Sequence, residues 1–156
     1  MRILIVSDTH GDIDFFNEVI TKEGRFDMVL HCGDGSGESD YFEKRADCPV
    51  YAVKGNCDIF SHESNTRIVT VAGKRLYMEH GVRICNYEKI EFDRFASDNK
   101  VDAIIYGHTH RQRIEKTDKV FIVNPGSLAR PRDGGNSYVV LTIGNDGVMN
   151  FEGKRI

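Results

Sequence analysis

The sequence predicts an α/β fold in which two mixed β-sheets pack face to face, with helices on the outside. In the first half of the chain, short apolar runs alternate with helical patterns, which is typical of a parallel sheet with right-handed crossovers. Strand-like runs then follow one another at short spacing, which favours antiparallel pairing late in the chain. No linker or low-complexity stretch divides the sequence, so we expect one domain spanning residues 1–156.

The individual elements follow from their hydrophobic patterns. Arg2–Val6 is too uniformly apolar for a half-exposed strand, so it is predicted to be central and covered on both faces. Further strands are predicted at 28–32, 50–54, 67–72, 75–79, 103–106, 111–116, 120–123, 137–143 and 148–151. Helices are predicted at 12–23, 40–45 and 87–99. In the last of these, Ile90 and Phe95 are expected to face inward, with Phe92 as a further candidate.

Composition excludes several function classes. A chain of 156 residues with 40% hydrophobic content can bury about 70% of the surface that its unfolded form exposes, so it needs no disulfides to fold. The four cysteines form no Cys-x-x-Cys pair, which excludes a zinc ribbon and favours the cytoplasm. No apolar run approaches the ~20 residues of a membrane span. A net charge of -3 with scattered basic residues argues against a dedicated nucleic-acid surface.

Residues that can bind metals follow five of the predicted strands. They are Asp8 and His10, Asp34, Asn56, His80, and His108 with His110. The carboxyl ends of strands are where open α/β sheets place their binding crevices. This mixed set of nitrogen and oxygen ligands is too rich for one tetrahedral zinc ion and suits two transition-metal ions.

Each of these residues also has an ordinary structural explanation when taken alone. Asp8 could cap a helix, Asp34 could hold a turn, and His80 could be a hydrogen-bonded core histidine. Strand geometry would place His108 and His110 on one side, as a cradle for a single ion. With two ions, the same pair could clamp both, provided that the chain turns near Gly107. The joint occurrence of all five blocks favours a metal site.

In their order along the chain, these blocks resemble the five signature blocks of the calcineurin-like metallophosphoesterases. The blocks are Asp8-Thr9-His10, Gly33-Asp34, Gly55-Asn56-Cys57-Asp58, His80-Gly81 and Gly107-His108-Thr109-His110. Residues 124–127 resemble a block of the small single-domain phosphodiesterase branch. The resemblance implies an αββα fold and two metal sites that share Asp34 as the bridging carboxylate. It assigns Asp8, His10, Asp34 and His110 to one ion, and Asp34, Asn56, His80 and His108 to the other.

The resemblance also implies an activity, namely hydrolysis of phosphodiester bonds by a metal-bridging hydroxide at a binuclear centre. Two cations about 3.5–4 Å apart can lower the pKa of a shared water towards ~7 and stabilise phosphoryl charge. The expected cofactor is a pair of divalent ions, with manganese first and nickel, iron or zinc as alternatives. None of the cysteines carries the arginine spacing of a cysteine-nucleophile phosphatase.

One position departs from the family pattern, because Cys57 stands where a histidine usually protonates the leaving group. A thiol is a weaker acid than an imidazolium, which predicts a preference for phosphodiesters over alkyl phosphomonoesters. The catalytic candidates are Asp34, Asn56, Cys57 and Asp58. The candidates for substrate binding are Asn124, Gly126, Ser127 and Arg130, since a Gly-Ser turn offers backbone donors and an arginine can fork onto phosphate.

Two other functions are compatible with the same residues. One is a phosphomonoesterase or nucleotide pyrophosphatase with the same centre. The other is a non-catalytic, metal-binding scaffold for protein partners, as in the small retromer subunit branch of the fold. The expected substrate is a small phosphodiester or nucleotide-like molecule, without a membrane partner. Family precedent suggests a homodimer or homotetramer.

Overall fold

The structure is a computed structural model that describes residues 1–156. Its helices are α1 (Asp14–Glu23), α2 (Ser39–Ala46) and α3 (Lys89–Asn99), with short 3-10 turns at Ser36–Glu38 and Ile84–Asn86. The strands are β1 (Arg2–Val6), β2 (Met28–His31), β3 (Val50–Ala52), β4 (Thr66–Val71), β5 (Lys74–Glu79), β6 (Ala103–Tyr106), β7 (Gln112–Lys116), β8 (Phe121–Pro125), β9 (Ser137–Ile143) and β10 (Met149–Arg155). No helix is long and apolar enough to cross a membrane.

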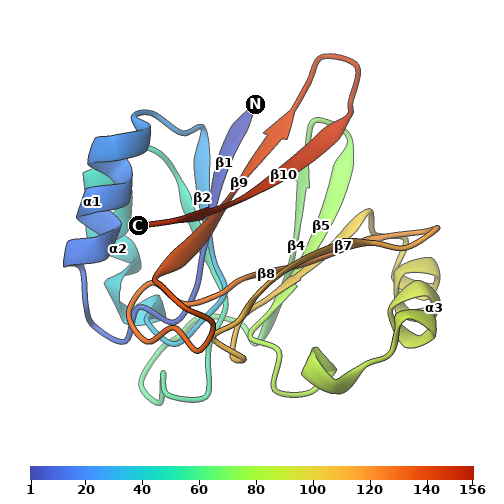
Figure 1. Ribbon diagram of the computed structural model, residues 1–156, viewed down its shortest axis with the longest axis horizontal. Helices are drawn as coiled ribbons and strands as arrows, with labels where there is room; N and C mark the ends of the chain where they lie inside the picture. Colours follow the sequence, from blue (N-terminus) through green and yellow to red (C-terminus); the bar gives the residue numbers. More distant parts are fainter.

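The strands form two five-stranded mixed sheets (Figure 1). The first has the order β10-β9-β1-β2-β3, in which β1, β2 and β3 are parallel and β9 runs antiparallel to β1. The second has the order β4-β5-β6-β8-β7, with β5, β6 and β8 parallel and antiparallel strands at both edges. Helices α1 and α2 cover the outer face of the first sheet, and α3 covers that of the second.

The central strand β1 shows why this arrangement is stable. Its Ile3 and Ile5 side chains enter the core between the two sheets, whereas Leu4 and Val6 pack with α1 and α2 on the other face. All four residues are fully buried. Burying an aliphatic side chain of this size contributes about 1.5–3 kcal/mol, so both faces of the strand are stabilised. The two-sheet α/β fold and the covered position of this strand are therefore confirmed.

Two details differ from the expectation. Late strands are not all antiparallel, because α3 forms a crossover that brings β6 parallel to β5, and β8 then pairs in parallel with β6. The inward face of α3 is also different, since Phe92 is fully buried while Ile90 is 74% exposed. The helix begins at Lys89 and directs Phe92 and Ala96, which are four positions apart, towards the sheet, and this places Ile90 on the solvent side.

The carboxyl ends of the parallel strands of both sheets meet at one edge of the sandwich, the lower edge in Figure 1. The loops after β1, β2 and β3 come from the first sheet, and those after β5 and β6 come from the second. Loops from the two halves of the chain thus lie against each other. For example, the amide of His108 donates to Asp8 Oδ2 at 3.1 Å, and His80 Nδ1 donates to the carbonyl of Cys32 at 2.7 Å.

Candidate metal centre

Four of the strand-end loops bring acidic and imidazole side chains together at this edge. Asp8 and His10 follow β1, Asp34 follows β2, His80 follows β5, and His110 follows β6. Their ligand atoms form overlapping clusters, one of Asp8, His10 and His110 and another of Asp8, Asp34 and His80. Both clusters contain Asp8, which is fully buried. The structure therefore brings these five residues together at one place, and their role as metal ligands stays a prediction.

The backbone at this site adopts conformations that side chains other than glycine rarely take. Five of the candidate ligands have a positive φ: Asp8 (55°), His10 (47°), Asp34 (54°), His108 (67°) and His110 (57°). Such residues cost about 1–3 kcal/mol each and persist only where the surrounding structure enforces them. Strand β6 ends at Tyr106, so the strand alternation expected for His108 and His110 does not apply, and turns set their directions instead.

Distances within the clusters are short. The Nε2 atom of His110 lies 3.1 Å from Oδ1 of Asp8, and Nε2 of His80 lies 3.4 Å from Oδ2 of Asp34. His10 sits between the carboxylates, with its Nε2 3.9 Å from Asp8 Oδ1 and 4.0 Å from Asp34 Oδ2. Two carboxylates and three imidazoles therefore converge on a small volume.

Backbone carbonyls orient two of the imidazole rings. His80 Nδ1 donates to the carbonyl of Cys32 at 2.7 Å, and His110 Nδ1 donates to the carbonyl of Arg130 at 2.6 Å. In each ring this leaves Nε2 directed at the carboxylates. Histidines that ligate metals characteristically fix their second nitrogen in this way.

Three buried polar atoms at the centre have no hydrogen-bond partner, and they test whether the site fits a cation. They are Asp8 Oδ1, His10 Nε2 and His80 Nε2. An unsatisfied buried polar atom costs about 1–3 kcal/mol, so three of them in one place require an explanation. Divalent cations would bind all three, and imidazole with carboxylate suits zinc, iron, nickel and manganese. The residues present therefore fit divalent metal ions.

His108 and Asn56 lie beside these clusters. The His108 ring faces His80 with centroids 5.2 Å apart, whereas His110 faces His10 at 5.3 Å. The two histidines of this loop thus lie beside different rings, His108 beside His80 and His110 beside His10. This arrangement is in keeping with a clamp across two ions. Asn56 is exposed, and its Nδ2 donates to Cys57 Sγ at 3.4 Å. Their assignment to particular ions stays a prediction.

Opposing effects set the protonation of the imidazoles. Burial lowers the pKa of His10, and the charge of Arg130 acts in the same direction. Burial also opposes protonation of His80, but the nearby carboxylates of Asp34 and Asp8 raise its pKa overall. The Asp8 carboxylate, 3.1 Å from its Nε2, raises the pKa of His110. Since a ligand must give up its proton, cation binding at this centre competes with protonation of His80 and His110.

Asp58 supports the centre from below. Its carboxylate accepts the backbone amides of Asp34 (2.9 Å), Gly35 (2.8 Å) and Gly55 (2.8 Å), which ties the loop after β2 to the loop after β3. Burial opposes ionisation of this carboxyl, but these hydrogen bonds outweigh it and lower its pKa. Asp58 therefore positions the backbone of Asp34, and it also lines the pocket over the centre. A catalytic role for Asp58 stays a prediction.

Cys57 is exposed at the mouth of the centre. Its backbone amide donates to Asp34 Oδ1 at 2.7 Å, and its Sγ lies in a cluster with His10 and Asp34. These residues line a pocket of about 430 Å³ together with Glu38 and Arg130. Hydrogen bonding to Asp34 raises the pKa of the thiol, so Cys57 is a poorer proton donor here than an ordinary cysteine.

The substrate-binding candidates occupy two kinds of position. Asn124 and Ser127 are fully buried, where Asn124 Nδ2 donates to the carbonyl of Gly107 at 2.7 Å and Ser127 Oγ donates to the carbonyl of Asp8 at 2.8 Å. Gly126 is buried with them. Arg130 alone lines the pocket over the centre. Contact between any of these residues and substrate stays a prediction.

Sequence reasoning missed two polar residues near the centre. His31 is fully buried, with its Nδ1 accepting the Gly33 amide at 3.2 Å and its Nε2 3.1 Å from Thr9 Oγ1. The signal was its place as the last residue of β2, three before Asp34. Glu38 lines the pocket over the centre, and its Oε2 lies 3.5 Å from Thr9 Oγ1. No sequence pattern distinguished Glu38 from other surface acids.

A sequence profile of the calcineurin-like phosphoesterase superfamily domain matches residues 1–146. The chain belongs to this superfamily. Among calcineurin-like relatives, the probable metallophosphoesterase YsnB of Bacillus subtilis is 30% identical over 94% of this chain and 86% of its own length. The phosphodiesterase YfcE of Escherichia coli is 30% identical over 62% of this chain and 53% of its own.

The superfamily fold is also found in solved structures. Vps29 of Entamoeba histolytica, in a crystal structure complexed with Zn²⁺, superposes with a TM-score of 0.77 over 99% of both chains at 22% identity. At that identity the likeness shows the fold alone. The match to the calcineurin-like superfamily is what identifies the chain as a phosphoesterase.

Proposed function

We propose that the chain is a phosphodiesterase that depends on two divalent metal ions. The observation that carries the proposal is the convergence of three unpartnered buried atoms, Asp8 Oδ1, His10 Nε2 and His80 Nε2, at the strand ends. The cations would be held by Asp8, His10, Asp34, Asn56, His80, His108 and His110, with Asp34 between them. When bound, they supply Lewis acidity for activating water and for neutralising phosphoryl charge.

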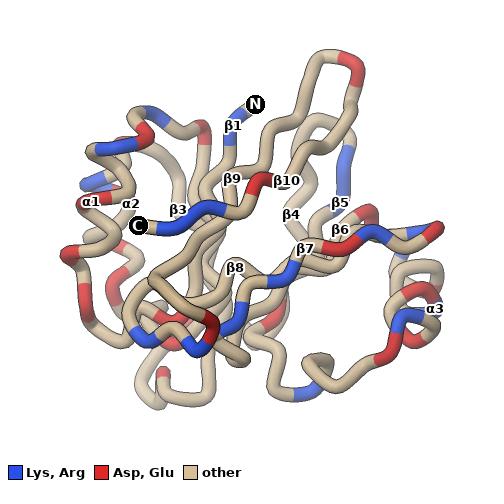
Figure 2. The backbone as a smooth tube through the Cα atoms, in the orientation of Figure 1, with Lys and Arg blue, Asp and Glu red and all other residues tan.

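The surroundings of the centre favour an anionic substrate. Arg130 lines the pocket over His10 and Asp34, and its charge reaches His10. Figure 2 shows two basic stretches on the loop between β8 and β9 that carries Arg130. A guanidinium there can form a bidentate pair with two phosphoryl oxygens. The name of YfcE, a phosphodiesterase, supports the same substrate class.

The cysteine at position 57 favours phosphodiesters over phosphomonoesters as the proposed substrates. General acid catalysis is worth about 10²–10⁴-fold, and its loss penalises basic leaving groups most. A thiol with a raised pKa next to Asp34 supplies little of it. Phosphodiesters with good leaving groups are therefore the expected substrates, and manganese is the first metal to test.

The proposal is tested with bis(p-nitrophenyl) phosphate and added Mn²⁺, comparing the natural chain with Asp34→Asn and His80→Ala. We expect turnover that requires metal and is lost in both variants. A phosphomonoesterase or nucleotide pyrophosphatase would instead prefer monoesters or nucleotide anhydrides in a substrate panel. Turnover that does not require metal, or that is unchanged in both variants, would contradict the proposal and favour a binding scaffold.

Three further expectations accompany this function. The substrate is proposed to be a small or nucleotide-like phosphodiester, because scattered basic residues provide no extended nucleic-acid surface. A cytoplasmic location and assembly into a homodimer or homotetramer stay predictions. Gel filtration with light scattering would measure the oligomeric state.

A further inference from the structure

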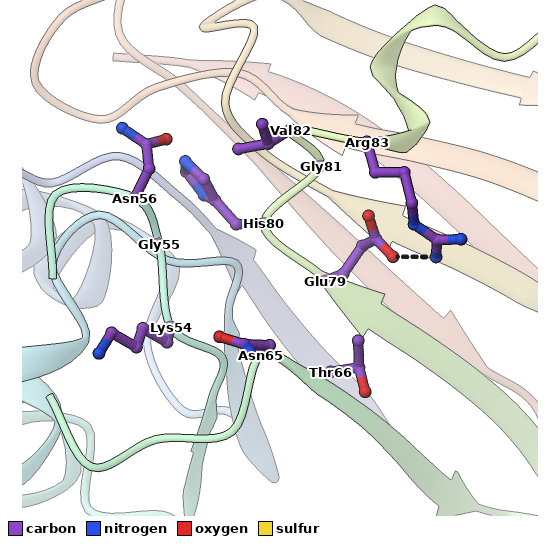
Figure 3. Close-up of a pocket in the computed structure, with 10 residues that line it drawn as sticks. All are labelled: Lys54, Gly55, Asn56, Asn65, Thr66, Glu79, His80, Gly81, Val82 and Arg83. Carbon is purple, nitrogen blue, oxygen red and sulfur yellow. Dashed lines mark hydrogen bonds and ion pairs between the residues drawn. The ribbon is translucent and has the colours of Figure 1, made fainter. Parts of the chain in front are cut away.

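A second pocket lies beside the metal centre, on the side of Asn56 and His80. Its volume is about 280 Å³, and Figure 3 shows it bordered by the loop after β3, the start of β4 and the end of β5. Asn56 and His80 belong both to the candidate centre and to the wall of this pocket. A molecule whose phosphate lies at the centre can therefore extend an ester group into the pocket.

Most of the residues that line the pocket are polar or charged. Val82 is the one hydrophobic residue of the lining, which contains no Phe, Tyr or Trp. Glu79 Oε2 accepts from Tyr77 at 2.6 Å and from Arg83 at 2.9 Å, whereas Glu79 Oε1 has no partner. The side chains of Asn65 and Thr66 are exposed and form no hydrogen bond within the chain. One carboxylate oxygen, one amide and one hydroxyl are thus available to a ligand.

The cations of this pocket already have partners. Arg83 pairs with Glu79, as the dashed line in Figure 3 marks, and Lys54 Nζ donates to the carbonyls of Ile59 (3.2 Å) and Ser61 (3.4 Å). The free groups do not include a cation, so the pocket is poorly suited to a second phosphate. A carboxylate accepts hydrogen bonds, and an amide both donates and accepts them, which together complement alcohol hydroxyls.

We infer that this pocket binds a small, hydroxyl-bearing alcohol, such as a glyceryl or sugar group, esterified to the phosphate at the metal centre. The inference rests on the proposed function. The wall has no Phe, Tyr or Trp on which a nucleobase would stack, and its one imidazole, His80, belongs to the candidate metal centre. The volume of the pocket suits a group of a few carbon atoms. Glu79 Oε1, Asn65 and Thr66 would discriminate such an alcohol from an alkyl chain of the same length.

The test compares two phosphodiesters that differ only in hydroxyl groups, 2,3-dihydroxypropyl propyl phosphate and dipropyl phosphate. Titration calorimetry with Mn²⁺-loaded protein measures both Kd values without requiring turnover. Each hydrogen bond contributes about 2- to 10-fold, so we expect the dihydroxypropyl diester to bind about 10-fold more tightly. Asn65→Ala and Thr66→Val should each bring that ratio closer to one. Thr70→Val, on the same strand but outside the pocket lining, is the matched control and should keep it.

The outcomes separate this inference from the proposed function. Equal Kd values for the two diesters in the natural chain, or a ratio that both pocket variants retain, would overturn the inference even if bis(p-nitrophenyl) phosphate is hydrolysed. Absence of all diester hydrolysis would overturn the proposed function, while the Kd ratio would still test the pocket. Failure to bind either diester overturns the inference as well.

Discussion

His110 and Asp8 come from loops of opposite sheets, and Nε2 of the histidine lies 3.1 Å from Oδ1 of the aspartate. Each residue is held in place by a second hydrogen bond. His110 Nδ1 donates to the backbone carbonyl of Arg130, and the backbone carbonyl of Asp8 accepts from Ser127 Oγ. The contact therefore joins the two halves of the sandwich at the point where a cation would bind. Substitution of Asp8 is the most direct way to separate fold from metal binding.

We expect Asp8→Asn to lower the affinity for Mn²⁺ by about 10²-fold or more, because even residues that only support a metal ligand account for about 10–100-fold. The neutral amide keeps the shape of the side chain but removes the charge shared by both clusters. Mass-spectrometric metal analysis after dialysis and direct Mn²⁺ titration measure the effect. Asp40→Asn, at an exposed position of α2, is the control. Unchanged affinity in a folded Asp8 variant would contradict this role.

Cys57→His should raise activity towards phosphomonoesters. The side chain is exposed at the pocket mouth, so an imidazole can be accommodated there. Restoring a general acid is worth about 10² -fold at the lower end of the usual range, and basic leaving groups should gain most. Initial rates across a series of aryl and alkyl monoesters measure the change, with metal content checked in parallel. An unchanged rate for monoesters at equal metal content would rule out the missing acid as the cause of the preference.

Hydrophobic pattern and strand-end chemistry predicted most of the fold and the centre. The uniform run Arg2–Val6 predicted a strand covered on both faces, and Asp8, His10, Asp34, His80 and His110 meet as expected. The directions of side chains that lie in turns could not be predicted. His108 and His110 have left-handed backbones, which no strand periodicity can reproduce.

Partners distant in sequence were also beyond prediction. Ser127 stays a candidate for substrate binding through its turn, but no local pattern predicted that its hydroxyl is buried against Asp8, more than a hundred positions away. Ile90 was expected on the inward face of the helix, but α3 begins at Lys89 and turns Phe92 and Ala96 inward, which leaves Ile90 exposed. In both cases tertiary contacts, rather than local preferences, determine the environment of the side chain.

Ser127→Ala should reduce the free energy of unfolding by about 1–3 kcal/mol, because the buried hydroxyl satisfies three backbone groups. It donates to the Asp8 carbonyl at 2.8 Å and accepts the amides of Ala129 at 3.2 Å and Arg130 at 2.8 Å. Urea unfolding measures the loss, and Ser64→Ala at an exposed position is the control. A variant with unchanged stability and a raised KM would instead identify Ser127 as a substrate contact.

The buried imidazole of His31 should make stability depend on pH. Burial lowers the pKa of His31 to about 4, from an ordinary value of 6.5. The unfolded chain therefore takes up this proton first as the pH falls. The stabilisation is fully present above pH 6.5 and is lost between 6.5 and about 4, by about 3 kcal/mol in total.

Urea unfolding of metal-free protein between pH 7 and pH 4 measures this loss. Other histidines and the carboxylates titrate in the same range, so the relevant quantity is the difference in unfolding free energy between the natural chain and His31→Gln. That difference should shrink by about 3 kcal/mol as the pH falls, since the glutamine has no proton to take up. The same subtraction with His62→Gln, at an exposed position, should show little change with pH. A His31 difference that stays constant across this range would show that the folded protein takes up this proton in the same pH range as the unfolded chain, so that the ring is protonated at pH 4. In that case Gly33 could not donate to Nδ1, and the hydrogen bonding around Thr9 would have to be reassigned.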